Sequence, residues 1–579
     1  MPSKNDKEGV ISVEKENGLI HDKHEIANEF NNFFVNVGVA IQQQTSQSAN
    51  NIIKPSKKYQ KFVKSKLATF SLKTVSVKEV RDILMTLPDK KSCGRDNLPV
   101  SLLKPVVDII LKPLVYIINM SINSDEVPSR LKISRVHPIY KNGNRSHMTN
   151  YRPISVLPIT AKILEKLVFN QLYTYFNDNY IINVNQSGFR PGHSTLTALL
   201  KVTEDWLHSM DLGKIIGMAT IDLRKAFDTV DHSILIDKLR LNGLDDHTCK
   251  WFESYLSDRV QYTMVNGIES SAQDIKCGVP QGSNLGPLLF MLFINDLPNC
   301  LEHCCVALYA DDTCIYCPGD KLADIEIKLN EDLQNISEWL LCNRLALNAK
   351  KCEAMLIGSQ RRTKNKILSL RINATEIGQV SSCKYLGVFI DSCLSWDKHV
   401  EYLCKSTVKN LYLLKRIRHC LSQETALLFY KTIAQSKLDY CDIVWNNTKK
   451  KNTQKLQILQ NRLLKTVLCV ESRYSTHLIY ESLSLDMLDL RRTKHTLCLM
   501  YKIVANLTPE YLNSKFELKP SSYHLRNNLQ ILSLPRLNTC FKKNSLTYHG
   551  AKLWNGLQSD FKLKPTYDSF KNYLNRNFN

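Results

Sequence analysis

The chain has 579 residues, of which 43% are hydrophobic, and it carries a formal net charge of +22 at pH 7. The apolar fraction is ordinary for packed cores, which excludes global disorder, and no segment reaches the ~18 consecutive apolar residues that a membrane-spanning helix needs. The basic excess favours a polyanionic partner, nucleic acid first and an anionic membrane second, although it also suits a merely basic protein.

The cysteine pattern is that of a protein from a reducing compartment. The 18 cysteines are scattered at irregular spacing, and the polar N-terminal sequence lacks the apolar core of a secretory signal. We therefore expect an intracellular protein, in the nucleus, the cytoplasm or both, with free thiols. Cys314 and Cys317 form a CxxC pair, but no second pair follows at finger spacing, so zinc is disfavoured.

The first ~70 residues are predicted to be a leader or linker that contains one helix. Five apolar residues recur there at helical spacing, namely Ile26, Phe30, Phe33, Phe34 and Val37. Residues 52–66 form a basic stretch. A solvated linker is the favoured interpretation, and a nucleic-acid contact or a nuclear-localisation patch are the alternatives.

Residues ~70–390 mix short β-type segments with amphipathic helices, which predicts an α+β fold class. The β-type segments are IIGMATIDL, VQYTMV, VALYAD and TCIYC, and two of the helical segments are TAKILEKLVFNQLYTYF and IEIKLNEDLQNISEWLLCN. After Trp396 the pattern becomes mainly helical and basic. The basic faces of those helices are either simply solvated or in contact with a nucleic-acid duplex.

Three carboxylates stand beside apolar strand-like segments. Asp222 ends one such segment, and Asp311 and Asp312 separate two others, which predicts a tight turn over residues 310–313. Neighbouring negative charges repel unless a cation compensates them, and hard oxygen ligands suit Mg²⁺. Two such ions ~3.5–4 Å apart can activate a hydroxyl and stabilise a leaving pyrophosphate. A solvent-exposed acidic hairpin is the usual fate of an isolated Asp-Asp pair.

The motifs around these carboxylates resemble those of reverse transcriptases. Tyr309-Ala310-Asp311-Asp312 resembles the YxDD box, Asp222 with Phe227 and Asp228 resembles the first metal motif, and GVPQGSNLGPLLF resembles the motif between them. The order and the spacing, roughly 60 and then roughly 30 residues, also match. KYLGVFID, NQSGFRPGHST and the segment from HPIYKNG to LEKLV extend the similarity over residues ~80–400. It is closest to non-LTR retrotransposons of the long interspersed type, jockey-like and chicken-repeat-like.

The resemblance implies a right-hand polymerase fold with fingers, a ferredoxin-like palm and a helical thumb, followed by a helix-rich C-terminal region. The expected boundaries are 1–70 for the leader, 71–215 for an N-terminal extension and the fingers, 216–392 for the palm, 393–470 for the thumb and 471–579 for the C-terminal region. The implied activity is RNA-directed DNA polymerisation, in which dNTPs extend a DNA 3′-hydroxyl on an RNA template. No membrane partner is expected.

The same resemblance assigns roles to individual residues. It implies two Mg²⁺ ions, with Mn²⁺ as a substitute, bound by Asp222, Asp311 and the Leu223 carbonyl, with Asp312 as a weaker ligand. The dNTP would contact Lys141, Arg152, Phe227 and Gln281, Lys351 would act as general acid, and Tyr385, Leu386 and Gly387 would hold the primer terminus. Alternatives remain: Phe227 as a core aromatic, Lys141 and Arg152 as solvated surface, and Lys350 in place of Lys351.

The chain also departs from the family pattern. KKSCGRDNLP, residues 90–99, lacks both prolines of the usual Lys-Ala-Pro-Gly-Pro-Asp-Gly stretch, which bears on the geometry of the fingers. No endonuclease is expected before residue 80, so the chain resembles a truncated copy or a gene product that starts late. The alternatives to an active enzyme are a decayed retroelement relic that only binds nucleic acid and an intron-encoded maturase. Intact carboxylates, Gln281 and Phe227 favour the enzyme.

Overall fold

The computed structural model describes residues 10, 12–15, 18–50, 58–63, 68–90, 92–373, 375–519 and 531–578. Most of the basic stretch 52–66 therefore lies outside the described residues. The chain divides into two compact units, and each is described by itself. The first unit takes the described residues within 1–189, 222–302 and 332–348. The second takes those within 190–221, 303–331 and 349–579.

The first unit is built around a five-stranded mixed sheet. Its strands are β3 (Ile133–Tyr140), β4 (Tyr151–Val156), β6 (Arg259–Val265), β7 (Ile268–Glu269) and β8 (Gln273–Ile275). The strand order is β4-β3-β6-β7, with β8 also paired to β6. β3 and β6 run parallel and the other pairs are antiparallel. Buried and half-buried residues alternate along β6, so one face of the strand is more deeply covered than the other.

The leader helix predicted from the first residues is present as α1 (Lys23–Asn50), preceded by the hairpin β1 (Val13–Lys15) and β2 (Gly18–Ile20). Phe30 and Phe34 are buried in a small core that α1 shares with the sheet, and the Phe30 ring meets the Tyr151 ring edge-on at 5.0 Å. The buried Asn31 amide bonds to Gln261 and accepts from Thr263, which fixes α1 on β6. The predicted helix is confirmed, and Ile26, Phe30 and Phe34 of the five apolar residues are buried, whereas Phe33 and Val37 are half-buried.

Seven further helices described in this unit surround the sheet and the loops connected to it. They are α2 (Val77–Thr86), α3 (Val100–Leu103), α4 (Val107–Asn123), α5 (Ile159–Asp178), α7 (His232–Leu241), α8 (Asp246–Leu256) and α9 (Gly286–Phe293). Almost every residue of α9 is buried, which explains its uninterrupted apolar sequence GPLLFMLF. α2 begins with a capping box in which Ser76 and Glu79 exchange side-chain and backbone hydrogen bonds.

The second unit contains a four-stranded antiparallel sheet in the order β11-β5-β10-β9. The strands are β5 (Ile215–Ile221), β9 (Cys305–Tyr309), β10 (Asp312–Gly319) and β11 (Glu353–Ile357), so the fourth strand in the chain lies beside the first, then the third and the second. β5 is buried on both faces, which explains why it is a continuous apolar segment rather than an alternating one. The β-type segments predicted at these positions are confirmed.

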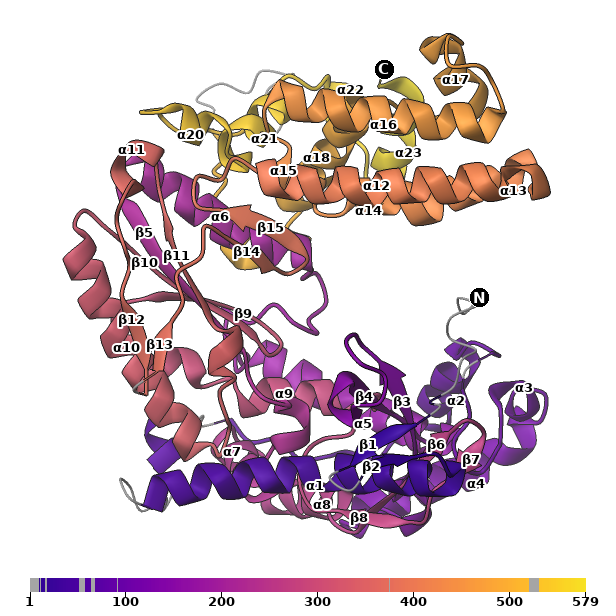
Figure 1. Ribbon diagram of the computed structural model, residues 1–579. Coiled ribbons are helices and arrows are strands. Elements are labelled where there is room, and N and C mark those ends of the chain that lie inside the picture. The colour runs from indigo at the N-terminus through magenta and orange to yellow at the C-terminus, as the bar shows by residue number, and fades with distance from the viewer. Residues whose placement is uncertain are drawn as a thin grey trace. The chain divides into compact units, whose positions relative to one another are not determined.

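Helices cover both faces of this sheet (Figure 1). α6 (Thr195–Asp211) packs on one face, where Trp206 meets Tyr316 of β10 edge-on at 5.9 Å. The first part of α10 (Leu322–Cys342) approaches the other face at Gly217, where a Cβ atom would come within 2.5 Å of the Ile325 side chain. Glycine is required at that position because the helix lies so close to the strand.

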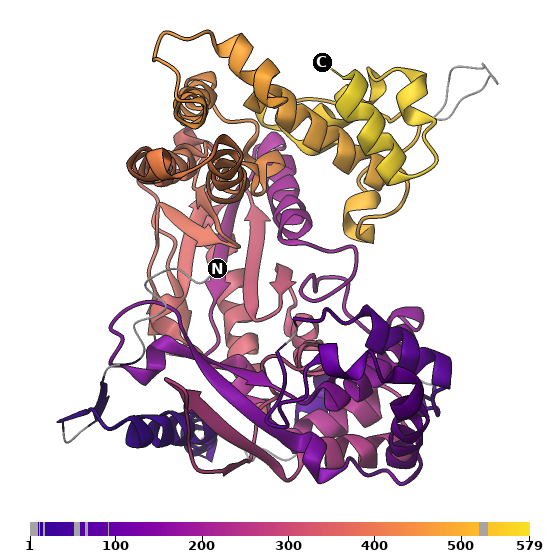
Figure 2. The same cartoon turned by 90° about the vertical axis from the view of Figure 1, so that its right-hand side faces the viewer.

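The remainder of the second unit is largely helical, in agreement with the pattern after Trp396. It comprises α11 (Gln360–Thr363), the hairpins β12 (Leu370–Ile372)–β13 (Thr375–Ile377) and β14 (Ser382–Tyr385)–β15 (Val388–Asp391), α12 (Asp397–Ile417), α13 (Gln423–Phe429), α14 (Ser436–Asp439), α15 (Asp442–Trp445), α16 (Lys450–Leu468), α17 (Thr476–Leu483), α18 (Leu488–Val504), α19 (Glu510–Asn513), α20 (Cys540–Lys543), α21 (Leu546–Asn555), α22 (Ser559–Lys562) and α23 (Tyr567–Asn577). Figure 2 shows α12 to α23 from a second side. One hydrophobic core joins α6, the sheet and α18 to α23.

Two predictions about the whole chain can be compared with these elements. All 18 cysteines are free thiols, as expected. Cys314 and Cys317 are both buried in β10, and residues three apart on a strand point to opposite faces, so this pair does not chelate one zinc ion. Within the described part of the chain, every helix is too short or too polar to cross a membrane.

Candidate active site

The loop after β5, residues 222–231, begins at Asp222 and is fixed there by a second segment of the same unit. The backbone N–H of Asn348 donates to the Asp222 carbonyl at 2.8 Å, and the Asn348 side-chain amide donates to Asp222 Oδ2 at 2.9 Å. Leu223 and Leu347 form an antiparallel bridge next to this pair. One oxygen of the Asp222 side chain is therefore oriented by a neutral amide donor.

The other end of the loop is fixed by Asp231, which caps the N-terminus of α7. Asp231 Oδ1 accepts from the Ile234 N–H at 3.1 Å and from the Ser233 hydroxyl, and Arg344 donates to Oδ2 at 2.6 Å. Burial raises the pKa of Asp231, but the hydrogen bonds from Ser233, Ile234 and Arg344 outweigh it and the net shift is downward. Asp231 is thus held as a carboxylate at neutral pH.

The PQG segment packs back against the middle of the loop. The Val279 N–H donates to the Phe227 carbonyl at 2.9 Å and the Gly278 N–H to the Val230 carbonyl at 2.8 Å. Gly282 has φ of +117°, and a Cβ atom there would lie 2.5 Å from the Ser155 carbonyl oxygen, so only glycine fits. The segment forms a turn at Gln281 and Gly282, and that turn lies directly against β4.

Gln281 connects the turn to two other elements. Its carbonyl accepts from the Ser155 N–H on β4 at 2.7 Å, and its side-chain amide donates to Asp228 Oδ1 at 2.7 Å. The other oxygen of Asp228, Oδ2, is buried without a hydrogen-bond partner. Burial raises the pKa of Asp228 to about 6, although Lys225 and the bond from Gln281 oppose the shift.

Phe227 belongs to a small aromatic cluster. Its ring stacks on Phe290 of α9, with ring centroids 4.2 Å apart and planes 20° apart, and it meets Phe189 edge-on at 6.1 Å. Phe290 is fully buried, whereas Phe227 is only half-buried. One face of the ring is therefore anchored in the core, and the residue retains exposed surface on which a substrate could lie.

Asp311 and Asp312 lie at the hairpin between β9 and β10. Tyr309 pairs with Asp312, so the turn has two residues, Ala310 and Asp311. The turn predicted over residues 310–313 therefore lies one residue earlier in the chain, because Asp312 and Thr313 already pair with β9 as part of β10. Ala310 has φ of +55°, a left-handed conformation that costs an alanine about 1–2 kcal/mol. Asp311 is half-buried and Asp312 is exposed. Strain of this kind tends to persist at functional sites, where the surrounding structure over-determines it.

Lys141 and Arg152 lie together on the β3–β4 hairpin. Arg152 pairs with Ile139, and the Lys141 N–H continues the ladder by donating to the Asn150 carbonyl at 2.8 Å. Because Lys141 is two residues beyond Ile139, both basic side chains leave the same face of the hairpin. Both residues are exposed.

The remaining predicted residues lie in the second unit. Lys350 and Lys351 are both exposed in a short 3-10 turn that precedes β11, and the structure does not favour one over the other as an acid. Tyr385 is buried at the end of β14, and Leu386 and Gly387 form the two-residue turn to β15, with φ of +44° and +83°. Two consecutive positive φ angles define the turn type that suits a tight hairpin.

Three residues of the site escaped the motif analysis. Asn348 and Arg344 hold the two ends of the loop 222–231, and Tyr440 donates from its hydroxyl to the Leu386 carbonyl at 2.8 Å. Asn348 stands in the segment LALNAKKCEAM, residues 345–355, which also contains Lys350 and Lys351. Its position two residues before Lys350 was the available signal, but nothing in the local pattern indicates its partner.

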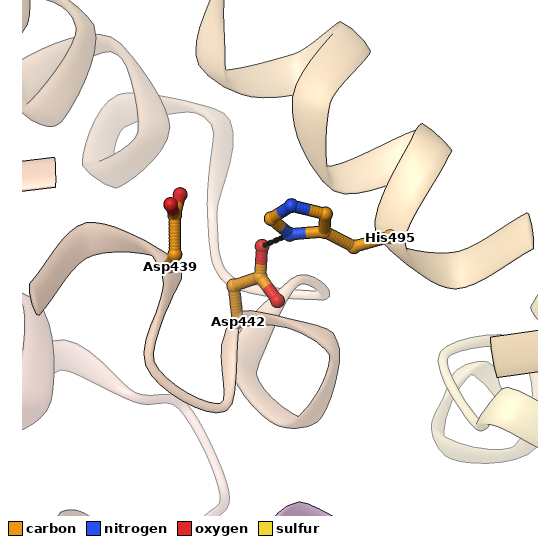
Figure 3. A group of neighbouring side chains, drawn as sticks. All are labelled: Asp439, Asp442 and His495. Carbon is orange, nitrogen blue, oxygen red and sulfur yellow. Dashed lines mark hydrogen bonds and ion pairs between the residues drawn. The ribbon is translucent and has the colours of Figure 1, made fainter. Parts of the chain in front are cut away.

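A separate acidic group lies among the C-terminal helices, where Asp439, Asp442 and His495 approach one another (Figure 3). His495 Nδ1 is 2.6 Å from Asp442 Oδ2, and both oxygens of Asp439 accept from Arg491. The fully buried Arg492 adds a second positive charge beside Asp442 and lies over the Trp445 ring. Because two guanidinium groups already balance the two carboxylates, this group is an internal ion network rather than a metal site.

Known proteins share these motifs. Residues 139–390 match the family described as reverse transcriptase (RNA-dependent DNA polymerase). The RNA-directed DNA polymerase from mobile element jockey of Drosophila melanogaster is 28% identical over 407 residues, which cover 68% of this chain and 44% of that protein. The probable RNA-directed DNA polymerase from transposon BS of the same organism is 28% identical over 444 residues, which cover 73% of this chain and 48% of that protein.

A third relative, the probable RNA-directed DNA polymerase from transposon X-element of Drosophila melanogaster, is 27% identical over 397 residues, which cover 67% of this chain and 43% of that protein. Residues 139–390, which include the loop 222–231, the PQG turn and the β9–β10 hairpin, are therefore similar to a reverse transcriptase domain. Within that class, the relatives confirm the resemblance to non-LTR retrotransposon polymerases. The chain spans less than half the length of the curated relatives it matches.

Proposed function

We propose that this protein is an RNA-directed DNA polymerase of a non-LTR retrotransposon, which acts in the nucleus, the cytoplasm or both. It extends a DNA 3′-hydroxyl with dNTPs on an RNA template. One observation carries the proposal. Asp222 directly follows β5, Asp311 and Asp312 stand at the head of β10, and these two strands are neighbours in one antiparallel sheet whose register pairs Ile221 with Thr313. Chain connectivity thus brings the carboxylates to the same end of that strand pair.

The donor set fits divalent metal ions of the magnesium type. Carboxylate oxygens, with the Leu223 carbonyl as an additional ligand, are the hard donors that Mg²⁺ prefers, and Mn²⁺ accepts the same set. Asp222 and Asp311 are proposed as the main ligands and Asp312 as the weaker one. Two ions would supply charge stabilisation to the attacking and leaving oxygens of an in-line displacement. The amide of Asn348 donates to Asp222 Oδ2 without adding a positive charge.

If the carboxylates bind the metal ions, the surrounding elements can be assigned to the palm, fingers and thumb of a right-hand polymerase fold. We propose that the sheet β11-β5-β10-β9 is a ferredoxin-like palm, because its strand order and the helix α10 between β10 and β11 suit that topology. The sheet with β3 and β4 would belong to the fingers, and α12 to α16 to the thumb. The boundaries 71–215, 216–392, 393–470 and 471–579 remain predictions.

Nucleotide selection is proposed for four residues of the first unit. Lys141 and Arg152 extend from one face of the β3–β4 hairpin, where an ammonium and a planar guanidinium suit triphosphate oxygens. Phe227 would lie under the sugar and exclude a 2′-hydroxyl, because its ring is braced from behind by Phe290. Gln281 would contact the nucleotide and template, and its contacts with Ser155 and Asp228 hold it in place.

Two further roles are proposed in the second unit. Lys351 would protonate the leaving pyrophosphate, with Lys350 as the alternative. Tyr385, Leu386 and Gly387 would support the primer terminus. The turn is braced by Tyr440, whose ring would lie 3.0 Å from a Cβ atom at position 387 and whose hydroxyl bonds to the Leu386 carbonyl. A rigid turn of this kind suits a primer grip, since it can oppose displacement of the 3′-end.

Primer extension on poly(rA)–oligo(dT) with Mg²⁺ tests the proposed function. We expect the wild-type protein to incorporate dTTP and Asp311→Ala to lose incorporation while it still binds the heteroduplex. Incorporation that survives Asp311→Ala would contradict the metal assignment. Binding without incorporation by the wild type, across Mg²⁺ and Mn²⁺ concentrations, would favour a relic that only binds nucleic acid.

Salt dependence provides a second test of the proposed thumb. Exposed basic residues on α12 and α16 are Lys398, Lys405, Lys409, Lys415, Arg416, Lys450, Lys451, Lys455 and Arg462. Each phosphate contact should contribute about 0.7–0.9 to the slope of log affinity against log salt. We expect Lys409→Gln or Lys455→Gln to lower that slope by about one unit if the residue contacts the duplex. An unchanged slope for both variants would mean that these faces are only solvated.

A further inference from the structure

We propose that Asn348 is a positioning residue for Asp222, and that residues 344–348 act as a strap across the loop 222–231. This inference rests on the proposed function, because it takes Asp222 to be a metal ligand. It concerns contacts inside the first unit only. The strap supplies a donor to the carboxylate at the start of the loop and a second contact at the end of the loop.

The contacts of Asn348 fix both the backbone and the side chain of Asp222. The Asn348 N–H donates to the Asp222 carbonyl at 2.8 Å, and Asn348 Nδ2 donates to Asp222 Oδ2 at 2.9 Å. The Arg224 N–H donates to the Ala346 carbonyl at 2.9 Å, which continues the same antiparallel ribbon. Because three consecutive positions are paired, neither the loop backbone nor the carboxylate rotates independently of the strap.

The strap also holds the far end of the loop. Arg344 donates to Asp231 Oδ2 at 2.6 Å, and Asp231 in turn caps α7 through the Ile234 N–H. Arg344 itself has φ of +56°, a left-handed conformation that directs the chain from the end of α10 into the strap. The loop that carries Asp222 and Phe227 is therefore clamped at both ends by one short segment.

The chemistry of an amide suits the position next to Asp222. An amide N–H orients one carboxylate oxygen without adding charge, so the carboxylate stays available to a cation. An ammonium group at the same position would compete with the cation, and a carboxylate would repel Asp222. Partners that orient a metal ligand typically contribute 10–100-fold to metal affinity. Asn348 should therefore affect metal binding although it is not itself a ligand.

The experiment compares Asn348→Ala with a matched control, Asn343→Ala. Asn343 is buried next to the strap, and its amide donates to the Trp339 carbonyl at 2.8 Å rather than to Asp222. Mn²⁺ binding to the full-length protein is measured by electron paramagnetic resonance. We expect Asn348→Ala to weaken Mn²⁺ binding about 10-fold. Asn343→Ala should leave Mn²⁺ affinity within twofold of wild type.

An isosteric variant separates positioning from packing. Asn348→Asp fills the same volume, but its ionised carboxylate cannot donate to Asp222, so single-turnover dTTP incorporation should fall about 10-fold with heteroduplex affinity unchanged. Wild-type incorporation by Asn348→Asp would contradict the positioning role. So would wild-type Mn²⁺ affinity in a folded Asn348→Ala variant. Asp222→Ala separates the two hypotheses. If this variant also binds Mn²⁺ like wild type, Asp222 is not a metal ligand and the proposed function is contradicted, rather than the positioning role of Asn348 alone.

Discussion

Two regions carry the proposed metal ligands, and they are built differently. The loop 222–231 is irregular and depends on distant parts of the chain, since Asn348 holds Asp222, Arg344 holds Asp231 and Gln281 holds Asp228. The β9–β10 hairpin is local, since its two-residue turn is defined by the ladder of the strands on either side. Long-range contacts therefore hold the carboxylate of the loop, whereas the local geometry of two paired strands holds the carboxylates of the hairpin.

This difference has a consequence for substitutions. A carboxylate at a hairpin turn keeps its place as long as its two strands pair, whereas Asp222 depends on segments more than a hundred residues away. We therefore expect the loop to be sensitive to changes outside its own sequence. The hairpin should be sensitive mainly to changes within it.

The largest effects are expected from the carboxylates themselves. Asp222→Asn and Asp311→Asn should each lower dTTP incorporation at least about 10³-fold, because each removes one charged ligand from a site that stabilises developing charge. Asp312→Asn should cost less, about 10-fold, because Asp312 is exposed and is proposed as the weaker ligand. Single-turnover primer extension measures all three.

Heteroduplex affinity is the control for these variants and should stay within twofold of wild type. An Asp312→Asn enzyme as inactive as Asp311→Asn would overturn the ranking of the two residues. Equal stability of Asp222→Asn and wild type would be consistent with the loop geometry, since an asparagine oxygen still accepts from Asn348.

The next largest effect is expected at Gly282, which lets the PQG turn approach β4. Gly282→Ala should lower stability by about 3 kcal/mol, because it combines a positive φ with a Cβ atom 2.5 Å from the Ser155 carbonyl oxygen. Thermal unfolding measures the loss. Gly267→Ala is the matched control: its φ is also positive, at +84°, but no atom lies within 4 Å, so it should cost only about 1 kcal/mol. Equal losses would show that the close approach is unimportant.

A smaller effect with a distinct pH signature is expected at Asp228. Burial raises its pKa from 3.8 to about 6, so the folded state holds its proton more tightly than the unfolded state does. Stability from this group is therefore present below pH 3.8 and is lost as the pH rises to about 6. A shift of this size corresponds to at most about 3 kcal/mol.

Asp228→Asn removes this pH dependence and keeps the acceptor for Gln281. The variant should match wild type near pH 3.8 and become more stable than wild type above pH 6, as measured by thermal unfolding at several pH values. The exposed Asp274 provides the control, because Asp274→Asn should follow the wild-type profile. Parallel profiles for Asp228→Asn and wild type would contradict the burial of the charge.

The contrast between loop and hairpin also explains what the sequence could predict. The strands, the turn at Ala310 and Asp311, and the leader helix followed from local periodicity and turn chemistry, because neighbours in sequence decide them. The resemblance to reverse transcriptases followed from the order and spacing of the motifs. Asn348 and Arg344 did not, because a hydrogen bond between residues 222 and 348 has no local signature in a single sequence. Tyr440 was missed for the same reason.

The smallest effect is expected at Ala310, and it separates strain from packing at the hairpin. Ala310→Gly relieves a left-handed conformation worth about 1–2 kcal/mol, but it loses a buried methyl group worth about 0.8 kcal/mol and adds backbone entropy to the unfolded chain. These contributions nearly cancel, so the stability should change by less than about 1 kcal/mol. Ala307→Gly, in β9 of the same hairpin, is buried without a positive φ and should lose about 1.5 kcal/mol. Comparable losses for both variants would mean that the turn stores no strain, and the precision of Asp311 would then come from the strands alone.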